Sequence, residues 1–223
     1  MKILNLYSGI GGNRKLWGDE HEITAIEYNP EIAKIYQDLF PNDKVVVADA
    51  HQYLLEHYKE FDFIWSSPPC PTHSRARYGL GFHGGKVEGV YPDMRLYQEI
   101  IFLDKHFKGK YCVENVQAYY KPLIEPQTVG RHWYWANFPI TKIKVAPSGI
   151  SQQSKKYLEK NVGGANIGAV RSFNISEFEN KLGYNLSKYK IKDKRLLLRN
   201  CVEPEIGLHI LKESLLPTLT IGE

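Results

Sequence analysis

The sequence predicts an α/β protein with a mainly parallel β-sheet, because short β-rich segments alternate with helical patterns in its first half. Parallel strands need crossover connections of about a dozen or more residues, which are usually helical. The repeated order of strand and helix therefore indicates βαβ units. The expected strands are residues 2–7, 22–28, 44–49 and 61–67, and the expected helices begin after Gly11, run from 30 to 40 and surround Leu54.

The second half continues this pattern and then loses it. The segment from about 146 to 195 mixes Gly, Ser, Asn, Lys and Tyr without sustained periodicity, so no regular element is expected there. The other expected elements are an amphipathic helix over 94–107, a strand over 110–116, two antiparallel strands over 131–138 and 141–145, and a helix that starts near Glu203 or Pro204.

The charge is distributed unevenly along the chain. The net charge is only +4, which does not by itself distinguish a nucleic-acid binder from another soluble enzyme. Residues 142–199, however, hold 13 Lys and Arg against 4 Asp and Glu, whereas the rest of the chain holds 16 against 21. The sequence therefore combines an acidic body with a basic segment that suits a polyanion such as nucleic acid.

The composition excludes several classes of protein. No run approaches the ~18 apolar residues of a membrane-spanning helix, and a glycine loop stands where a signal peptide has its apolar core. We therefore expect a cytoplasmic protein with no membrane partner. The three cysteines are odd in number, widely spaced and without a CxxC pair, which argues against a disulfide framework and against a metal site.

A glycine-containing loop and two acidic residues follow the first three expected strands. Residues 7–12 (YSGIGG) come after the first strand, Glu27 ends the second, and Asp49 ends the third. Glycines allow a ligand to approach backbone N–H groups closely, and a carboxylate placed like Glu27 can bind the hydroxyls of a ribose. A structural turn, helix N-caps and solvated charges are the alternatives. In this order the features favour a nucleoside-bearing cofactor at the carboxyl edge of the sheet.

Cys70 stands between two prolines directly after the expected strand 61–67. The prolines fix the backbone and remove N–H donors, so the thiol is held rigidly just beyond a strand. The alternative is a buried, inert cysteine, which is the commoner fate of a lone thiol, but the surrounding residues are polar. Glu114 places a carboxylate at the end of another expected strand, whereas Cys112 and Cys201 have apolar neighbours and are expected in the core.

Together these segments resemble DNA (cytosine-5-)-methyltransferases of the compact bacterial or phage type. The motifs NLYSGIGG, AIEYNP, Asp49, SPPCPTHS, VENV and LRNCVEPEIG occur in the order of that family and cover most of residues 1–138 and 196–212. The resemblance implies a Rossmann-like S-adenosylmethionine-dependent methyltransferase fold, in which a mixed, mainly parallel sheet carries a small target-recognition insert. The implied domains are a catalytic and cofactor-binding domain over 1–145, a target-recognition segment over 146–195, and a C-terminal part of the catalytic domain over 196–223.

The resemblance implies that the first half of the chain binds S-adenosyl-L-methionine, which leaves as S-adenosyl-L-homocysteine. Residues 7–11 would surround the methionine moiety and the adenine edge, Glu27 would bind the ribose hydroxyls, and Asp49 would bind the adenine amine. Asn200 would close the pocket, with a structural role at a helix start as the alternative. The implied cofactor residues are Tyr7, Ser8, Gly9, Ile10, Gly11, Glu27, Tyr28, Asp49, Ala50, Pro68, Asn200 and Val202.

The resemblance also implies the catalytic residues. The Cys70 thiolate would add to carbon 6 of cytosine, and Glu114 would hydrogen-bond ring nitrogen 3 and the exocyclic amine, so that carbon 5 can accept the methyl group. Because those atoms lie within the base stack, the cytosine should be flipped out. Arg131 is the best match to the arginine that supports the cytosine carbonyl, with a surface residue as the alternative. Pro71 and Trp133 stand where the family commonly has glutamine and a second arginine.

Double-stranded DNA is the implied substrate, and the basic segment is the part of the chain that is implied to recognise its sequence. The glycine- and proline-rich loop over 68–92 would contact phosphates, with simple solvation as the alternative for its arginines. The expected context is a cognate restriction endonuclease or phage protection, and the expected assembly is a monomer or a weak dimer. Methylation of a structured RNA such as tRNA and a catalytically inert DNA-binding or regulatory subunit are the alternative functions. The implied DNA-binding residues are Thr72, Ser74, Arg75, Arg77, Lys188, Lys190 and Lys192.

Overall fold

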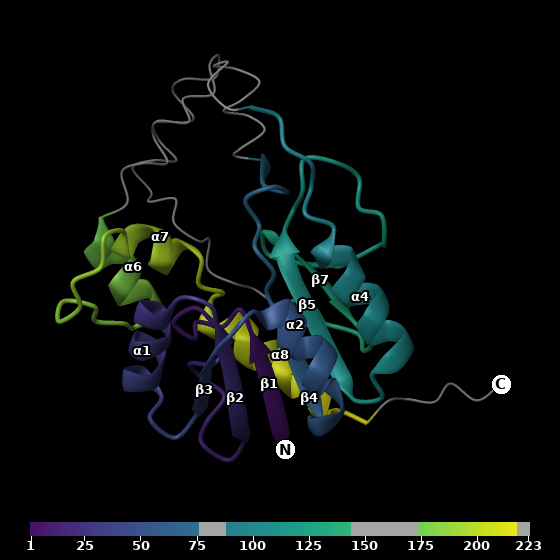
Figure 1. The fold of residues 1–223 in the computed structure, drawn as a ribbon, viewed down its shortest axis with the longest axis horizontal. Coiled ribbons are helices and arrows are strands. Elements are labelled where there is room, and N and C mark those ends of the chain that lie inside the picture. Colours follow the sequence, from purple (N-terminus) through teal and green to yellow (C-terminus); the bar gives the residue numbers. More distant parts are fainter. Residues whose placement is uncertain (76–87, 144–173, 218–223) are drawn as a thin grey trace.

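The computed structural model describes residues 1–75, 88–143 and 174–217, which form a seven-stranded sheet with flanking helices (Figure 1). The strand order is β3-β2-β1-β4-β5-β7-β6. The strands are β1 (Lys2–Leu6), β2 (Glu22–Glu27), β3 (Lys44–Val47), β4 (Phe63–Ser66), β5 (Lys110–Val116), β6 (Gln127–Val129) and β7 (His132–Ala136). The helices are α1 (Pro30–Leu39), α2 (Ala50–His57), the 3₁₀ helix η1 (Tyr58–Glu60), α4 (Arg95–His106), α6 (Ile175–Leu182), α7 (Lys194–Arg199) and α8 (Pro204–Leu215).

Five of the strands run parallel, which confirms the predicted fold class. β1 pairs in parallel with β2 and β4, β2 with β3, and β4 with β5. β7 runs antiparallel to both β5 and β6. The carboxyl ends of the five parallel strands therefore meet at one edge of the sheet, which is where open α/β sheets bind ligands.

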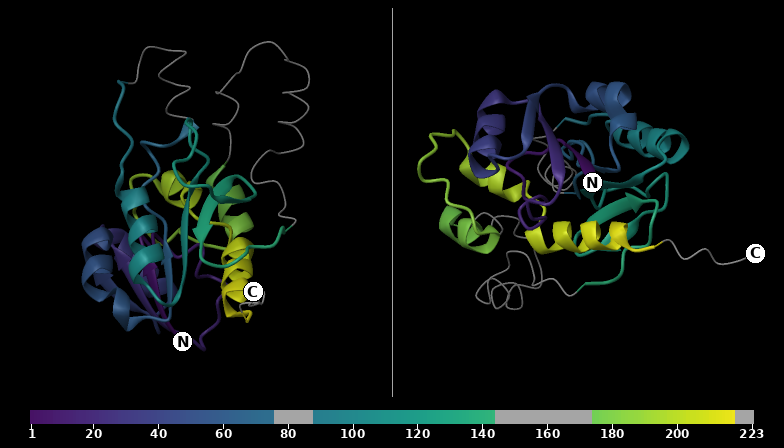
Figure 2. Two further views of the ribbon diagram at one scale, coloured as in Figure 1. Left: turned by 90° about the vertical axis from the view of Figure 1, so that its right-hand side faces the viewer. Right: turned by 90° about the horizontal axis from the view of Figure 1, so that it is seen from below.

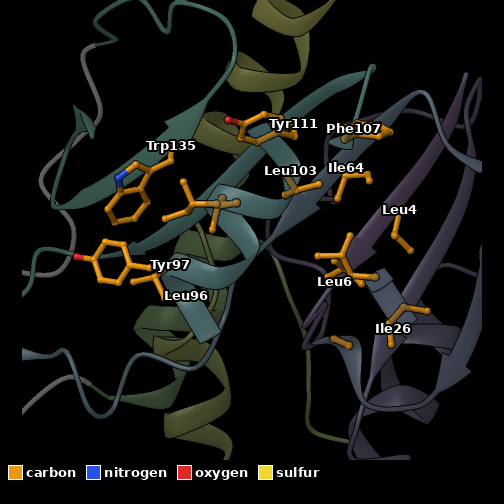
Figure 3. Close-up of a cluster of buried hydrophobic side chains, with 14 residues drawn as sticks. Leu4, Leu6, Ile26, Ile64, Leu96, Tyr97, Leu103, Phe107, Tyr111 and Trp135 are labelled. Carbon is orange, nitrogen blue, oxygen red and sulfur yellow. The ribbon is translucent and has the colours of Figure 1, made fainter. Parts of the chain in front are cut away.

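Two apolar clusters hold helices against the two faces of the sheet. On one face α2 and α4 pack on the parallel strands, with Leu103 of α4 near Ile64 of β4 in Figure 3. On the other face α8 packs through Ile206 and Ile210, and Figure 2 shows it opposite α2 and α4. Full burial of one such side chain contributes about 1.5–3 kcal/mol. Both faces are thus covered, as apolar parallel strands require.

The helices α1, α4 and α8 begin close to the predicted residues, and α2 contains Leu54 as predicted. Local signals place the start of α1. The side chain of Asn29 accepts a hydrogen bond from the N–H of Glu31 at 2.9 Å, and Pro30 occupies the first turn of α1. The longest of these helices, α4 and α8, have 12 residues each. Over the described ranges, none of the helices combines the length and apolar character that crossing a bilayer needs.

A third apolar cluster attaches α6 and α7 to the body of the protein beside α1 (Figure 1). It joins Ile10, in the loop after β1, to Leu182 and Leu198, and the Tyr184 hydroxyl donates a hydrogen bond of 2.9 Å to the carbonyl of Gly11. The sequence does not predict α6 or α7, because helices of 8 and 6 residues show few apolar repeats. Residues 174–195 thus fold against the loop after β1.

The helix expected after the first loop does not form; residues 12–16 make consecutive turns instead. Asn13 donates a side-chain hydrogen bond of 2.8 Å to Asn5 of β1. Arg14 donates two hydrogen bonds, of 2.9 and 3.0 Å, to the carboxylate of Asp43. These buried contacts fix the side chains along the segment, and glycine and asparagine are weak helix formers, so tertiary contacts decide the local conformation.

The strand expected over 141–145 is wrong for its described residues, because 141–143 belong to no strand and 144–145 lie outside the described residues. The antiparallel neighbour of β7 on its outer side is β6, whose three residues are too few for a sequence pattern. The Gln127 side chain accepts from the N–H of Ile140 at 2.6 Å and donates to the carbonyl of Phe138 at 2.9 Å. These two hydrogen bonds tie residues 138–140 to the edge strand β6 through a side chain, without strand pairing.

Candidate active site

The loop after β1 turns sharply at the edge where the parallel strands end. Tyr7, Gly9 and Gly11 have positive φ angles of 55°, 55° and 78°, a region that residues other than glycine seldom adopt. The N–H of Ser8 donates to the carbonyl of Ile26 at 3.0 Å, and the N–H of Gly11 donates to the carbonyl of Ser8 at 2.9 Å. The loop is thus a fixed turn, and its amides do not open a helix as the sequence suggested.

The glycines of this loop meet two different requirements. A Cβ atom at Gly11 would lie 2.5 Å from the ring of Phe40, and one at Gly12 would lie 2.6 Å from the carbonyl oxygen of Val202. Both positions therefore need glycine for packing. At Gly9 a Cβ atom would meet none of the described residues within 4 Å, so a ligand can approach its backbone closely.

Glu27 ends β2 beside this loop, and its half-buried carboxylate accepts hydrogen bonds from two backbone N–H groups. Gly9 donates to Oε2 at 3.0 Å, and Asn29 donates to Oε1 at 2.9 Å. A carboxylate has about four acceptor sites, which leaves capacity for the hydroxyls of a nucleoside. The neighbouring Tyr28 is 77% exposed. Glu27 therefore faces the loop, and Tyr28 offers an uncovered ring next to it.

Asp49 follows β3 and caps α2. Its Oδ1 accepts from the N–H of Gln52 at 3.0 Å, and its Oδ2 lies 4.0 Å from Nη1 of Arg95, at the start of α4. Asp49 is therefore a helix N-cap, which was the alternative to a ligand-binding role. Its carboxylate is exposed, so it can accept further hydrogen bonds from the solvent side. Asp49 can serve the helix and a ligand amine together.

The other residues predicted for the cofactor occupy different environments around this edge. Ile10 and Val202 are buried in the apolar clusters of α7 and α8, and Ala50 is buried at the start of α2. Pro68 is buried after β4, whereas Asn200 is exposed and ends α7. The structure thus buries Ile10, Ala50, Pro68 and Val202 and leaves Asn200 exposed.

The buried hydroxyl of Ser8 has no hydrogen-bond partner among the described residues. Ser8 is 6% exposed, and a buried polar group without a partner costs about 1–3 kcal/mol. Together with the open side of Gly9 and the acceptor capacity of Glu27, it marks a place for a ligand with several polar groups. These residues fit a nucleoside-bearing cofactor such as S-adenosylmethionine.

Cys70 lies beyond β4 on a loop that the residues after β5 hold in place. The Asn115 side chain donates a hydrogen bond of 2.9 Å to the carbonyl of Pro68. The Cys70 carbonyl accepts from the N–H groups of residues 73 and 74 at 3.0 Å each. Because Asn115 follows Glu114 directly, the strand that carries the acid also fixes the loop that carries the thiol.

The predicted DNA contacts of this loop are partly engaged within the protein. Thr72 Oγ1 accepts a hydrogen bond of 2.9 Å from a backbone N–H in the segment before α4. Ser74 forms an antiparallel bridge with Ala118, and Arg75 donates from Nε to the Ala118 carbonyl at 3.0 Å. Arg77 lies outside the described residues. The described part of the loop is therefore anchored to the segment after β5.

Glu114 faces the same edge from β5 and contacts a histidine that sequence reasoning missed. The residue is 8% exposed, and its Oε1 lies 3.7 Å from Nε2 of His132. His132 begins β7, the antiparallel neighbour of β5. Arg131, the arginine predicted from the sequence, stands one residue earlier and is exposed. The structure thus brings His132 into contact with the acid and leaves Arg131 at the surface beside it.

Three buried polar atoms near the β5–β7 pair have no hydrogen-bond partner within the described part of the chain. They are Nδ1 of His132, the hydroxyl of Tyr134 and Oε2 of Glu203. Burial and the charges of Glu114 and Glu203 raise the pKa of Tyr134 well above its usual value. Burial opposes ionisation of Glu203, but neighbouring positive charges, first that of Arg131, hold its pKa below the usual value. This cluster has hydrogen-bonding capacity that a polar ligand can satisfy.

The electrostatic surroundings of Cys70 act in two directions. Burial raises the pKa of the Cys70 thiol above its ordinary value of 9.0, and the carboxylate of Glu114 raises it further. The positive charges of Arg199 and Arg131 oppose this rise. The thiol is therefore mostly protonated at neutral pH in the free protein, and its ionisation depends on the charge of Glu114.

The lysines predicted to bind DNA lie between α6 and α7. Lys188, Lys190 and Lys192 are exposed, and Nζ of Lys188 lies 4.9 Å from the centre of the Tyr189 ring. Arg199, at the end of α7, acts electrostatically on Cys70. Positive charge therefore extends from this loop toward the candidate nucleophile, as a polyanionic substrate requires.

The thiols and acids of the described residues form no candidate metal centre. In residues 1–75, 88–143 and 174–217 there is no group of three or more His, Cys, Asp or Glu side chains that could hold a metal ion. Cys70, Cys112 and Cys201 are free thiols. Cys112 and Cys201 are buried in apolar clusters, as predicted.

Comparison with known proteins identifies the family of the chain. Residues 1–122 match the family model of C-5 cytosine-specific DNA methylases. The chain belongs to this family. The matched region runs from β1 through β5, so it contains the loop after β1, Cys70 and Glu114.

Two similar proteins show how far the likeness extends. The type II methyltransferase M.Bsp6I of Bacillus sp. (strain RFL6) is 32% identical over 89 residues, which span 39% of this chain and 28% of that protein. A mutant of DNMT2 from Spodoptera frugiperda has a similar structure, with a TM-score of 0.56, 18% identity, and coverage of 96% of this chain and 99% of that chain. The likeness to DNMT2 concerns the fold, which is a methyltransferase fold.

Three residues of the site escaped the sequence prediction. Asn115 had a signal, because it forms with Glu114 a polar pair in an otherwise apolar strand. His132 and Glu203 had none, because strand pairing brings the first and helix packing the second to the β5–β7 pair.

Proposed function

We propose that this methylase transfers a methyl group from S-adenosylmethionine to carbon 5 of a cytosine in duplex DNA. The observation that carries the proposal is the placement of Cys70 just beyond β4 and of Glu114 near the carboxyl end of the neighbouring parallel strand β5, with the Asn115 side chain bonded to the carbonyl of Pro68. Binding of DNA alone needs neither a thiol nor an acid at these positions, so a catalytically inert subunit is disfavoured. A role in restriction-modification or phage protection fits the likeness to a type II methyltransferase.

Cys70 acts as the nucleophile in this mechanism. Its sulfur bonds to carbon 6 of the cytosine while Glu114 holds a proton at ring nitrogen 3, which gives carbon 5 the electron density of an enamine. S-adenosylmethionine, when bound, supplies the sulfonium methyl group that carbon 5 accepts. Loss of the carbon-5 proton and of the Cys70 sulfur then restores the aromatic base and the thiolate.

The electrostatics of Cys70 and Glu114 link their protons. The Glu114 carboxylate adds to burial in raising the pKa of Cys70, so the thiolate is favoured when Glu114 carries a proton. A hydrogen bond from Glu114 to ring nitrogen 3 requires that same proton. Binding of the base therefore favours the ionised thiol when carbon 6 comes within reach.

The cofactor belongs at the carboxyl ends of β1 to β3 in this proposal. Residues 7–11 would hold its methionine moiety, Glu27 its ribose and Asp49 its adenine, and S-adenosylhomocysteine would remain after transfer. The unpartnered hydroxyl of Ser8 and the open side of Gly9 support this assignment. Arg131 would support the carbonyl of the cytosine.

Target recognition is assigned to residues 146–195, between the two parts of the catalytic domain, 1–145 and 196–223. The described portion, 174–195, carries the exposed lysines and is attached to the loop after β1 through Tyr184. Such lysines suit phosphates, which position a protein on DNA without reading its sequence. Base reading then falls to residues 146–173, outside the described residues.

The decisive experiment measures transfer of labelled methyl from S-adenosylmethionine to duplex DNA by the purified full chain. Label is expected in 5-methylcytosine, and Cys70→Ala should lower the rate by at least about 1,000-fold. Cys112→Ala, which removes a thiol from the same protein, should retain transfer. Bisulfite sequencing of DNA from cells that express the gene then reports the recognition sequence.

Three results would contradict the proposal in different ways. Label in tRNA and none in DNA would assign an RNA substrate. Transfer that survives in Cys70→Ala would exclude the covalent step. Binding of DNA without transfer to any nucleic acid would indicate a catalytically inert subunit.

A further inference from the structure

Glu99 is a buried carboxylate on α4 that accepts three hydrogen bonds from other segments. The residue is 1% exposed. Its Oε1 accepts from the Tyr7 hydroxyl at 2.6 Å and lies 2.9 Å from Nδ1 of His51, and its Oε2 accepts from the Ser66 hydroxyl at 2.6 Å. Hydrogen bonds this short to an ionised group are among the strong ones in proteins.

The three partners of Glu99 come from the segments that build the candidate active site. Tyr7 opens the cofactor loop after β1, and Ser66 is the last residue of β4, directly before the loop that carries Cys70. His51 is the second residue of α2, after the cap Asp49. One carboxylate therefore joins the cofactor loop, the nucleophile loop and the helix beyond β3.

Packing alone does not explain a carboxylate at this position. Its neighbours on α4, Leu96, Ile100 and Leu103, fill the apolar cluster under the sheet. Burying a charge among them is unfavourable unless its hydrogen bonds are satisfied. Tyr7 also holds a positive φ angle of 55°, a strained conformation that persists where surrounding contacts enforce it. The bond from Tyr7 to Glu99 is such a contact.

We propose that Glu99 is a positioning residue that sets the cofactor loop and the nucleophile loop relative to each other. This inference rests on the proposed function, because it assigns cofactor binding to the loop that begins at Tyr7. Loss of the carboxylate charge weakens the bonds to Tyr7 and Ser66 together, because a neutral amide accepts at one oxygen only and without charge assistance. Weakening of the first bond weakens cofactor binding, and weakening of the second slows transfer by displacing Cys70.

The test is calorimetric titration of S-adenosylhomocysteine into the purified full chain. Glu99→Gln keeps the volume of the side chain and removes its charge, and is expected to weaken binding by about tenfold. Glu125→Gln removes a charge from an exposed residue and is expected to bind like the wild type. A carboxylate that serves only folding would lower the melting temperature of Glu99→Gln and leave affinity unchanged, which would overturn the inference.

Two hydroxyl deletions separate the arms of the network without removing the charge. Tyr7→Phe is expected to raise KM for S-adenosylmethionine, and Ser66→Ala to lower kcat with little change in KM. In a double-mutant cycle, the effects of Tyr7→Phe and Glu99→Gln should be less than additive, because both act on the same contact. If the changes in binding free energy of the two single variants summed to that of the double variant, the hydrogen-bond network would be contradicted. If Glu99→Gln does not fold, the KM of Tyr7→Phe and the kcat of Ser66→Ala still test whether Glu99 positions the two loops.

Failure of the inference can be told apart from failure of the proposed function. If the wild type binds no S-adenosylhomocysteine, the cofactor assignment is wrong and Glu99 has no loop to position. If the wild type binds it and Glu99→Gln binds it equally well, the proposed function stands and the positioning role is wrong.

Discussion

The two halves of the catalytic edge satisfy their polar groups differently. At the ends of β2 and β3, the acids are occupied by the backbone: Glu27 accepts from two N–H groups, and Asp49 caps α2. Near the β5–β7 pair, polar atoms of His132, Tyr134 and Glu203 are buried without a partner among the described residues.

This difference separates two ways of preparing a site. The cofactor half is held in shape by its own hydrogen bonds, which reduces the ordering required when a ligand binds. The catalytic half carries unmet hydrogen-bonding capacity, which lowers stability until a polar ligand satisfies it. Ser8 is the exception in the cofactor half, since its buried hydroxyl has no partner in the described part of the chain.

The largest expected effect comes from substituting one acid in each half, Glu114 in the catalytic half and Glu27 in the cofactor half. Glu114→Gln should lower kcat by about 100-fold or more, because a positioned acid contributes roughly 10²–10⁴ to catalysis, while the affinity for S-adenosylhomocysteine stays unchanged. Glu27→Gln should instead weaken that affinity and leave kcat intact at saturating cofactor. Methyl-transfer kinetics and calorimetry measure both. The two halves would not be distinct if either variant changed both quantities equally.

A second prediction compares two glycines of the cofactor loop. Gly12→Ala should lower the free energy of unfolding by about 2–3 kcal/mol, because its Cβ would collide with backbone at Val202. Gly9→Ala has open space and is destabilised only by its left-handed backbone, by about 1–2 kcal/mol. Urea unfolding of the two variants gives the comparison. A larger loss in Gly9→Ala would mean that its open side is filled by protein.

A third prediction uses pH in the catalytic half. Because burial and Glu114 raise the pKa of Cys70 above 9.0, its alkylation by iodoacetamide should keep accelerating as pH rises through 9. Glu114→Gln removes the like charge and should lower that pKa, so alkylation at pH 8 becomes faster. Arg199→Gln should change the rate in the opposite direction. Mass spectrometry of the modified peptide follows the reaction, and identical profiles would show that Glu114 does not act on the thiol.

The smallest expected effect lies outside both halves. Replacing Lys188, Lys190 and Lys192 by glutamine should weaken binding of duplex DNA, and the slope of log K against log salt should become shallower by about 0.9 for each phosphate that a lysine no longer neutralises. Affinity for S-adenosylhomocysteine should not change. Fluorescence anisotropy at several salt concentrations measures the slope. An unchanged slope would show that these lysines are only solvated.

Local patterns account for what could be predicted from the sequence. The strands β1 to β5 and β7 and the helices α1, α2, α4 and α8 follow from periodicity, proline and caps such as Asn29. Cys70 and Glu114 follow from short motifs that each lie within one loop or strand. The failures lie where local and distant contacts compete, as in residues 11–18, where Asn13 and Arg14 bond to distant residues instead of forming a helix.

The sequence by itself determined the class of the fold, the family and the two residues of the proposed chemistry, because periodicity and motifs are properties of neighbouring residues. The tertiary structure alone decided which side chains support them. Glu99 and Tyr7 are 92 positions apart in the chain, and His132 meets Glu114 only through antiparallel pairing. A buried polar group needs a partner wherever the fold supplies one, and no local pattern records that partner.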